Sequence, residues 1–458
     1  MNKKKNQNTT EKSKTYENLN RKAFIKTYGC QMNVNDSEFI TGQLSQLGYL
    51  TTEDIFNSDL ILLNTCCVRA KVEQKIYSLI GKIKKIKENN TNIILGICGC
   101  IASKEKDTLF NKFPYIDLIF GPSQMNELKK IIIERKESNN KKYISYENNP
   151  EFSLRNTPIN RESKISAWIQ IMRGCNNYCS YCVVPYTRGP EQSRLVLEIL
   201  SEVENLAHNN YKEIFLLGQN VNSYGKNLPE PVAFSKLLTF LNNINGIERI
   251  RFMTSHPKDL NFDLIKVIRN SDKVCEHIHL PIQAGSDKIL KIMNREYNID
   301  QYKSIIKEIR NNIDNVSITT DIMVGFPGET EEDFQQTLDT FEEIKFDDAF
   351  TFIYSNRENT LASLMPSQVP LQVKKERLWK LINLQRRISS EINKKLEGEI
   401  LEVLVDKKSI KNISGQLSGR TKTNKTVVFN GEDKLVGQLI KVKILESDTW
   451  TLYGELVK

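Results

Sequence analysis

The sequence lacks a long hydrophobic run. Over its 458 residues no apolar stretch approaches the ~20 residues of a membrane-spanning helix, so we predict no membrane span. The chain begins Met-Asn-Lys-Lys-Lys with no apolar stretch after it, which argues against a secretory signal. Nine cysteines without such a signal predict a reducing, cytoplasmic compartment, where thiols are free to bind metals. The odd number of cysteines also fits a disulfide framework poorly.

Little of the net charge of +9 lies in the middle of the chain. Residues 1–22 contain seven Lys or Arg and two Glu, and residues 393–458 contain twelve basic and nine acidic residues, which leaves +1 for residues 23–392. Basic ends suit a polyanionic partner such as RNA. For residues 1–22, which are rich in Asn, Lys and Thr, we favour the simpler interpretation of a disordered basic tail.

Residues 23–137 alternate short apolar runs with amphipathic segments. This pattern predicts an α/β domain built on a parallel sheet. The expected strands are Ala23–Tyr28, Asp59–Leu63, Asn92–Cys98 and Asp117–Phe120, and the expected helices are Ser37–Leu47, Val72–Lys87 and Ser123–Glu134. Residues 138–164 are polar and low in apolar content, which predicts a linker.

A second alternating array occupies residues 165–392 and predicts a partial (β/α)6 barrel. The expected strands are Trp168–Met172, Glu213–Leu217, Arg249–Met253, His277–Leu280, Ser317–Val324 and Ala349–Tyr354. Each of them runs into a polar or Gly-rich motif, such as Gly218-Gln-Asn-Val-Asn after the second strand. Because βα barrels place their sites at the carboxyl ends of the strands, we expect the six motifs to converge on one mouth.

The pattern changes again in residues 393–458, after an expected amphipathic helix at Lys374–Lys395. Short β-runs punctuated by Gly, Asn and Asp predict a small antiparallel barrel of the oligonucleotide-binding kind. The expected strands are Ile400–Val405, Thr426–Phe429, Val436–Leu445 and Trp450–Val457.

Three cysteines with close spacing stand at the end of the first barrel strand. Cys175, Cys179 and Cys182 are separated by three residues and then by two, with no fourth cysteine nearby. Three thiolates leave one iron of a 4Fe–4S cluster without a protein ligand, and an open iron can bind a substrate or cofactor. The alternative is a zinc site, which requires a distant fourth ligand such as His256 or Cys275.

A second set of cysteines is dispersed over the N-terminal domain. Cys30, Cys66 and Cys100 each follow a predicted strand, and parallel strands end at one edge of their sheet. These residues therefore predict a second metal site at that edge. The neighbouring Cys67 and Cys98 leave the choice of ligands open, and buried free thiols are the alternative.

The flanking residues of both sets make the chain resemble the radical S-adenosylmethionine methylthiotransferases, over residues 23–458. In the N-terminal domain the resemblance rests on Thr27-Tyr-Gly-Cys-Gln-Met-Asn, Leu63-Asn-Thr-Cys and Gly99-Cys, and in the barrel on Arg173-Gly-Cys-Asn-Asn-Tyr-Cys-Ser-Tyr-Cys-Val-Val-Pro-Tyr-Thr-Arg-Gly, Leu217-Gly-Gln-Asn-Val-Asn, Thr254-Ser-His-Pro, His279-Leu-Pro-Ile-Gln-Ala-Gly-Ser and Val324-Gly-Phe-Pro-Gly-Glu-Thr. Gln31-Met-Asn and Pro185-Tyr-Thr-Arg-Gly are most similar to the branch that acts on isopentenylated adenosine in tRNA.

This resemblance implies two 4Fe–4S clusters and S-adenosylmethionine as cofactors. Cys175, Cys179 and Cys182 would hold the cluster that cleaves S-adenosylmethionine, and an auxiliary cluster that supplies the methylated sulfur would be held by Cys30, Cys66 and Cys100. The implied reaction is methylthiolation of carbon 2 of the adenine beside the anticodon. The alternatives are the same chemistry on threonylcarbamoyladenosine or a ribosomal protein, and a non-catalytic RNA-binding electron carrier.

We also predict roles for several residues near the strand ends. Gln219 and Asn220 are placed for polar contacts to the cofactor, and Arg194 for its carboxylate or, equally, for a surface charge at the start of a helix. His256 and His279 either line the mouth or are structural. We further expect an external, flavodoxin-like electron donor and a monomeric protein.

The expected RNA contacts lie in the C-terminal segment. In Gly419-Arg-Thr-Lys-Thr-Asn-Lys-Thr-Val-Val-Phe, basic residues alternate with Thr and Asn before a β-run. Such an array suits backbone phosphates and resembles the family's RNA-binding module, whereas charge alone also fits a solvated hairpin. The candidate nucleic-acid contacts are Arg420, Lys422, Asn424 and Lys425.

Overall fold

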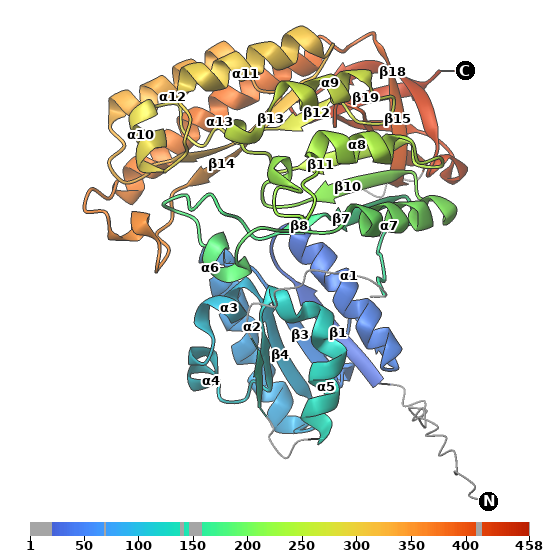
Figure 1. Cartoon of the computed structure of the whole chain (residues 1–458), viewed down its shortest axis with the longest axis vertical. Helices are drawn as coiled ribbons and strands as arrows, with labels where there is room; N and C mark the ends of the chain where they lie inside the picture. Colours follow the sequence, from blue (N-terminus) through green and yellow to red (C-terminus); the bar gives the residue numbers. More distant parts are fainter. Residues whose placement is uncertain (1–20, 68–69, 138–141, 146–157, 409–414, 458) are drawn as a thin grey trace, which may run out of the picture.

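The computed structural model describes residues 21–67, 70–137, 142–145, 158–408 and 415–457. The predicted tail at residues 1–22 lies almost wholly outside them, as does much of the predicted linker. An N-terminal α/β domain lies below a larger central domain, and the C-terminal barrel lies against the central domain near the C-terminus (Figure 1). Within the described ranges, no helix combines the length and the apolar character needed to cross a membrane.

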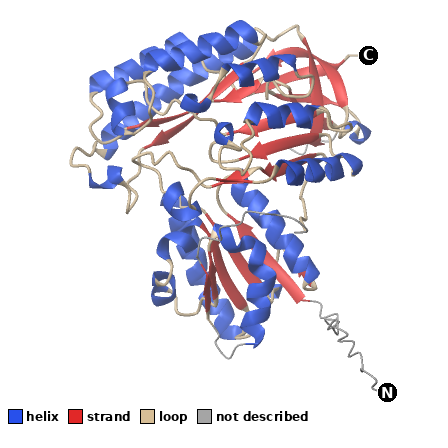
Figure 2. Ribbon diagram, viewed as in Figure 1, coloured by secondary structure: helices blue, strands red, loops and turns tan. Residues whose placement is uncertain are grey.

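The N-terminal domain is built on a six-stranded parallel sheet in the order β2-β1-β3-β4-β5-β6. Its strands are β1 (Arg21–Thr27), β2 (Tyr49–Thr51), β3 (Leu60–Thr65), β4 (Ile94–Gly99), β5 (Leu118–Phe120) and β6 (Tyr143–Ser145). Every residue of β3 is buried, because helices cover both faces of the sheet (Figure 2). The four predicted strands are present, and the short edge strands β2 and β6 add to them.

The helices of this domain connect the strands. They are α1 (Gln31–Gln46), α2 (Ala70–Asn89), α3 (Cys100–Glu105), α4 (Thr108–Lys112) and α5 (Leu128–Glu137). α1 begins six residues before the predicted helix at Ser37–Leu47. Its polar first turns, including Asn33, Asn35 and Asp36, are buried against the sheet edge and the central domain.

The central domain contains the six predicted strands in two parallel sheets, ordered β11-β10-β7 and β12-β13-β14. The strands are β7 (Ser166–Gln170), β10 (Glu213–Leu217), β11 (Arg249–Met253), β12 (His277–His279), β13 (Ser317–Val324) and β14 (Asp348–Ile353). Their helices are α7 (Val196–His208), α8 (Phe234–Asn242), α9 (Phe262–Asn270), α10 (Asp287–Ile292), α11 (Ile299–Asn312) and α12 (Glu331–Ile344). One apolar core extends through both sheets and confirms the open six-unit barrel.

After β7 the chain makes a short excursion toward the N-terminal domain. It comprises β8 (Met172–Arg173), α6 (Val184–Arg188) and β9 (Gln192–Ser193), with β8 and β9 paired antiparallel. α6 lies between the central domain and α3 of the N-terminal domain (Figure 1).

The C-terminal strands form a closed barrel in the order β15-β16-β17-β19-β18. They are β15 (Ile400–Lys408), β16 (Gln416–Thr421), β17 (Thr426–Asn430), β18 (Leu439–Ser447) and β19 (Thr451–Leu456). The prediction of a small barrel is confirmed, but its wholly antiparallel character is wrong. β17 and β19 pair in parallel, with Thr426 opposite Thr451, because closure brings the last strand beside β17 in the same direction.

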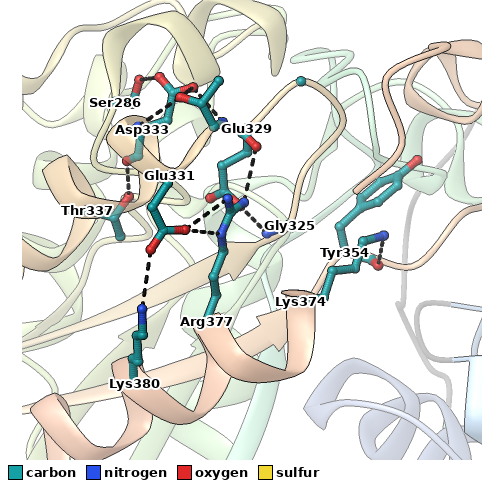
Figure 3. Close-up of polar contacts among 12 residues, drawn as sticks. Ser286, Gly325, Glu329, Glu331, Asp333, Thr337, Tyr354, Lys374, Arg377 and Lys380 are labelled. Carbon is teal, nitrogen blue, oxygen red and sulfur yellow. Dashed lines mark hydrogen bonds and ion pairs between the residues drawn. The ribbon is translucent and has the colours of Figure 1, made fainter. Parts of the chain in front are cut away.

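The long helix α13 (Leu371–Lys394) packs on the central domain and fixes the loop after β13. Arg377 donates from Nη1 to Glu329 Oε2 at 2.8 Å, and Glu329 accepts the Gly325 N–H (Figure 3). Arg377 also pairs with Glu331, at 3.2 Å. The Gly325-Phe-Pro-Gly-Glu-Thr motif is thus held in place by a helix about fifty residues further along the chain.

Candidate active site

Three loops at one edge of the N-terminal sheet each carry a cysteine. Cys30 follows β1, Cys66 follows β3, and Cys100 begins α3 directly after β4. Since β1, β3 and β4 are parallel neighbours, the three loops lie side by side at the carboxyl edge. The predicted adjacency of these loops therefore appears in the structure.

The two neighbouring cysteines differ in position. Cys98 lies within β4, is fully buried, and directs its sulfur to the Leu63 carbonyl at 3.6 Å. Cys67 packs beside Cys100 on the other face of the sheet. A hydrogen bond with Cys67 and the charge of Arg188 lower the pKa of Cys100. Cys98 is thus directed away from the edge, whereas Cys67 lies next to it.

A pair of asparagines holds the Cys30 loop against the loop after β3. Asn33 donates from Nδ2 to Asn64 Oδ1 at 3.2 Å, and Asn64 donates from Nδ2 to the Asn33 carbonyl at 2.8 Å. Gly29 has a φ of +130°, and a Cβ there would lie 2.7 Å from Cys66 Cβ. Only glycine permits this approach of the two loops.

The close-spaced triplet lies on the loop between β8 and α6. Gly174 has a φ of +74°, and a Cβ there would lie 1.9 Å from the Pro190 carbonyl, so the loop requires glycine before Cys175. The Cys182 N–H donates to the Cys179 carbonyl at 2.9 Å and tightens the turn. Burial raises the pKa of Cys175 to about 11 and that of Cys182 to about 12, so metal binding must displace protons.

The turn after α10 contacts the loop that carries the cysteine triplet. The Ser180 N–H donates to the Met293 carbonyl at 3.0 Å. Asn294 donates from Nδ2 to two carbonyls of the loop, at 3.2 and 3.3 Å. The next residue, Arg295, donates from Nη1 to Cys179 Sγ at 3.2 Å. The position of the triplet therefore depends on a segment more than a hundred residues away.

The two cysteine loops approach each other at the domain interface. Val183, the residue after the triplet, packs into the same apolar cluster as Cys67 and Cys100. At the end of α6, Arg188 Nη2 pairs with Asp36 Oδ2 at 3.0 Å, and both side chains are nearly buried. This buried ion pair joins the excursion of the central domain to the first helix of the N-terminal domain.

Across the described residues, no three His, Cys, Asp or Glu side chains are already arranged around one metal position. The fit to a cluster rests on the donor chemistry of the loop. Three thiols on one loop, without a fourth protein donor nearby, suit a 4Fe–4S cluster with one open iron. The buried guanidinium of Arg295 against Cys179 suits a group with negative charge.

The loops after β10 and β11 contribute polar groups to the mouth. Among the described residues, Gln219 Oε1 and Ser255 Oγ are buried without a hydrogen-bond partner, and they follow adjacent strands. Thr254 has a φ of +70°, which is strained for a β-branched residue. Asn220 instead donates to Asp259 Oδ2 at 2.7 Å and fixes the loop. The two unsatisfied oxygens are suited to bind a polar ligand.

Three segments of the chain match known families. Residues 22–121 match the uncharacterized protein family UPF0004, residues 169–341 match the Radical SAM superfamily, and residues 394–457 match the TRAM domain. A tRNA-2-methylthio-N(6)-dimethylallyladenosine synthase from Thermoanaerobacter pseudethanolicus is 50% identical over 436 residues, which cover 95% of this chain and 92% of that protein. The synthase of the same name from Carboxydothermus hydrogenoformans is 48% identical and is covered to 99%.

The chain belongs to this family of radical SAM methylthiotransferases. Membership implies a 4Fe–4S cluster and S-adenosylmethionine. Among solved structures, the radical S-adenosylmethionine methyltransferase TsrM from Kitasatospora setae superposes with a TM-score of 0.54 at 13% identity, covering 86% of this chain and 81% of that one. The cobalamin-dependent radical enzyme OxsB superposes with a TM-score of 0.52 at 14% identity, covering 79% and 56%. These likenesses show the shared fold alone.

In this methylthiotransferase, Arg194 has partners within the central domain. It donates from Nη1 to Glu202 Oε2 at 2.7 Å and to the Gln170 carbonyl at 2.9 Å, and its side chain is 3% exposed. The surface-charge interpretation is wrong, because the side chain is buried, and the ion pair disfavours the cofactor-ligand interpretation. The acidic residues of α7 neutralise Arg194 in a buried ion pair.

The two histidines have structural partners. His256 Nδ1 accepts the Lys258 N–H at 3.3 Å, and burial, together with Arg295 and Lys258, lowers its pKa to about 2. His279 Nδ1 lies 3.0 Å from Thr319 Oγ1. Both side chains are buried, which favours the structural alternative.

The basic turn of the barrel faces the central domain. Lys422 Nζ donates to the Asp272 carbonyl at 2.7 Å, and Lys425 Nζ lies 2.8 Å from Asp347 Oδ1. Arg420 and Asn424 bond to each other within the turn, at 3.0 Å. Each of these four residues therefore has a partner within the chain, which disfavours the predicted contacts with RNA phosphates.

The contacts of this turn place it at the amino ends of the strands of the central domain. Arg251 donates from Nη1 to the Lys422 carbonyl at 2.9 Å and from Nη2 to the Thr421 carbonyl at 2.6 Å. Arg249, the first residue of β11, donates to Glu402 Oε1 at 3.2 Å. The cysteine triplet lies beyond the opposite ends of the strands, so the turn and the mouth are separated by the length of the sheet.

Proposed function

We propose that the protein transfers a methylthio group to carbon 2 of N6-isopentenyladenosine beside the anticodon of tRNA. The observation that carries this proposal is the convergence of two cysteine loops on one interface, in a chain that shares half its residues with synthases named for this product. An unactivated aromatic C–H bond requires a radical oxidant. A 4Fe–4S cluster with an open iron supplies that chemistry by reductive cleavage of S-adenosylmethionine.

We assign Cys175, Cys179 and Cys182 as the ligands of that cluster. Support comes from their common loop, which is braced by the turn after α10, and from the burial of Cys175 and Cys179, which excludes water from a reactive radical. Gln219 Oε1 and Ser255 Oγ are the polar groups that we assign to S-adenosylmethionine, because both are buried at the mouth and unsatisfied.

A second 4Fe–4S cluster at Cys30, Cys66 and Cys100 would supply the sulfur. The proposal is supported by three adjacent loops at one sheet edge, which also faces the triplet's loop. We prefer Cys66 to Cys67 because the Cβ of Cys66 lies against the glycine that precedes Cys30. Arg188, which lowers the pKa of Cys100, would stabilise thiolate character there.

The partner that we propose besides tRNA is a cytoplasmic, flavodoxin-like donor of single electrons, because cleavage of S-adenosylmethionine consumes one electron. The TRAM barrel is an RNA-binding candidate, but its contact surface would be elsewhere than the docked turn at 420–425. A phosphate at that turn would lie at the end of the strands away from the mouth.

The test separates radical formation from sulfur transfer. Reconstituted protein is incubated with dithionite, S-adenosylmethionine and isopentenylated tRNA, and 5′-deoxyadenosine and methylthiolated nucleosides are measured by mass spectrometry. Wild-type protein should form both, Cys30→Ala only 5′-deoxyadenosine, and Cys175→Ala neither. Absence of 5′-deoxyadenosine from wild-type protein would refute the radical mechanism, and identical behaviour of the two variants would refute the division between the sites.

A further inference from the structure

Arg295 is a buried cation whose charge has no carboxylate partner among the described residues. Its side chain donates to the Tyr297 hydroxyl at 3.2 Å, to the Pro281 carbonyl at 3.4 Å and to Cys179 Sγ at 3.2 Å. The residue is 5% exposed. Removing a charge from water is unfavourable unless an opposite charge compensates it, and no carboxylate among the described residues does so at Arg295.

Three other buried arginines of the chain each have a carboxylate partner. Arg188 meets Asp36, Arg251 meets Glu213, and Arg377 meets Glu329. Figure 3 shows the last of these, with the guanidinium enclosed between two carboxylates. In the place where these arginines have a carboxylate, Arg295 has a cysteine sulfur of the triplet.

The surroundings fix Arg295 against that sulfur. The preceding residues, Met293 and Asn294, bond to the backbone of the triplet's loop. The Tyr297 ring lies under the guanidinium, with 5.4 Å from its carbon to the ring centroid. Because the same short turn braces the loop and carries the arginine, these contacts hold the guanidinium next to Cys179.

We propose that Arg295 is the buried counter-charge of the cluster held by Cys175, Cys179 and Cys182 and raises its reduction potential. The inference rests on the proposed function, which places the cluster there. One-electron reduction adds a negative charge to a group that already carries three thiolates. An adjacent cation and an N–H···S bond both stabilise the reduced form, and the electron comes from the external donor. No bond forms or breaks at Arg295, which is therefore a positioning residue.

The test is a reductive titration with dithionite that is monitored by electron paramagnetic resonance. It is carried out in a Cys30→Ala, Cys66→Ala background, which isolates one cluster. Arg295→Gln should lower the ratio of reduced to oxidised cluster at a fixed potential by tenfold or more, where tenfold corresponds to 59 mV for one electron. Arg295→Lys, which keeps the charge, should show a smaller decrease. Arg377→Lys is the control for a buried arginine with carboxylate partners and should leave the ratio unchanged.

A second measurement covers the case in which Arg295→Gln fails to hold iron. In a background with all three cysteines of the triplet changed to alanine, the counter-charge role predicts that Arg295→Gln leaves the Tm equal or higher, because an uncompensated buried charge is removed. A lower Tm there would identify Arg295 as structural and overturn the proposal, as would an unchanged potential in the iron-loaded variant. No cluster signal in the parent would instead contradict the assignment of the triplet.

Discussion

Lys425 offers a quantitative test of how the basic turn of the barrel acts. Its ammonium group lies 2.8 Å from Asp347 Oδ1, and both side chains are 12% exposed. Exposed ion pairs contribute ~0.2–1 kcal/mol, whereas breaking a fully buried pair costs ~3–5 kcal/mol. For this intermediate burial we expect Lys425→Ala to lower the free energy of unfolding by about 1–3 kcal/mol.

The same substitution should not change how tRNA binding depends on salt. A lysine that neutralises a phosphate contributes ~0.7–0.9 to the slope of log K against log salt. Binding is measured at several salt concentrations for wild-type protein and for the Lys422→Ala, Lys425→Ala double variant, and urea unfolding is measured in parallel. Asp347→Asn is the matched control, because it removes the charge and keeps an acceptor for the Ile318 N–H.

Two results would refute the docking role of this turn. A slope that falls by about 1.4–1.8 in the double lysine variant would mean that both lysines contact phosphates. Unfolding free energies of Lys425→Ala and Asp347→Asn that add fully in the combined variant would mean that the two residues do not interact, since contacting pairs deviate from additivity by ~0.5–3 kcal/mol.

Three further predictions concern the site and its supports. Asp36→Ala leaves Arg188 buried without its carboxylate partner, so it should cost ~3–5 kcal/mol in urea unfolding. It should also reduce methylthiolation more than 5′-deoxyadenosine formation, and equal losses would contradict a role at the sulfur site. Gly29→Ala places a Cβ 2.7 Å from that of Cys66 and should remove about four irons per chain, while iron content equal to wild type would show that the loops can separate. His256 has a folded-state pKa of about 2 against ~6.5 when unfolded, so below pH 6.5 the unfolded state binds a proton that the folded state does not. The free energy of unfolding is therefore unaffected by this group above pH 6.5 and is lower by about 2 kcal/mol at pH 5. His256→Gln should reduce the decrease of the urea midpoint between pH 7 and 5. A pH profile equal to that of wild-type protein would show that His256 is charged in the fold.

Much of the central domain follows from local patterns in the sequence. The strands at Glu213–Leu217, Arg249–Met253 and Ser317–Val324 have the predicted bounds, because each apolar run is closed by a polar motif that cannot continue it. The direction of a strand relative to its neighbours is harder to predict from the sequence. Period-two alternation specifies which face of β19 is buried, but not that closure of the barrel sets it parallel to β17.

Contacts between residues far apart in the sequence were the features that local sequence patterns did not predict. Arg295 follows Cys179 by 116 residues, and no local pattern links a turn after a helix to a cysteine loop. Arg194 is different, since Glu198 and Glu202 follow at spacings of four and eight residues on the same helical face, a signal for an internal ion pair that was available in the sequence. Lys422 and Lys425 show that basic residues alone do not distinguish a phosphate contact from a domain contact.

The shortness of helix α6 has a consequence for the separation of the two cysteine loops. Arg188 lies six residues after Cys182 and reaches Asp36, beside the Cys30 loop. A helical residue advances the chain by about 1.5 Å and turns it by about 100°. Inserting one residue into α6 would rotate Arg188 away from its partner and change the gap between the two cysteine loops. The length of α6 thus sets how far apart the two cysteine loops lie, and a variant with one more residue would be expected to lose the Arg188–Asp36 ion pair and to hold the two loops at a different separation.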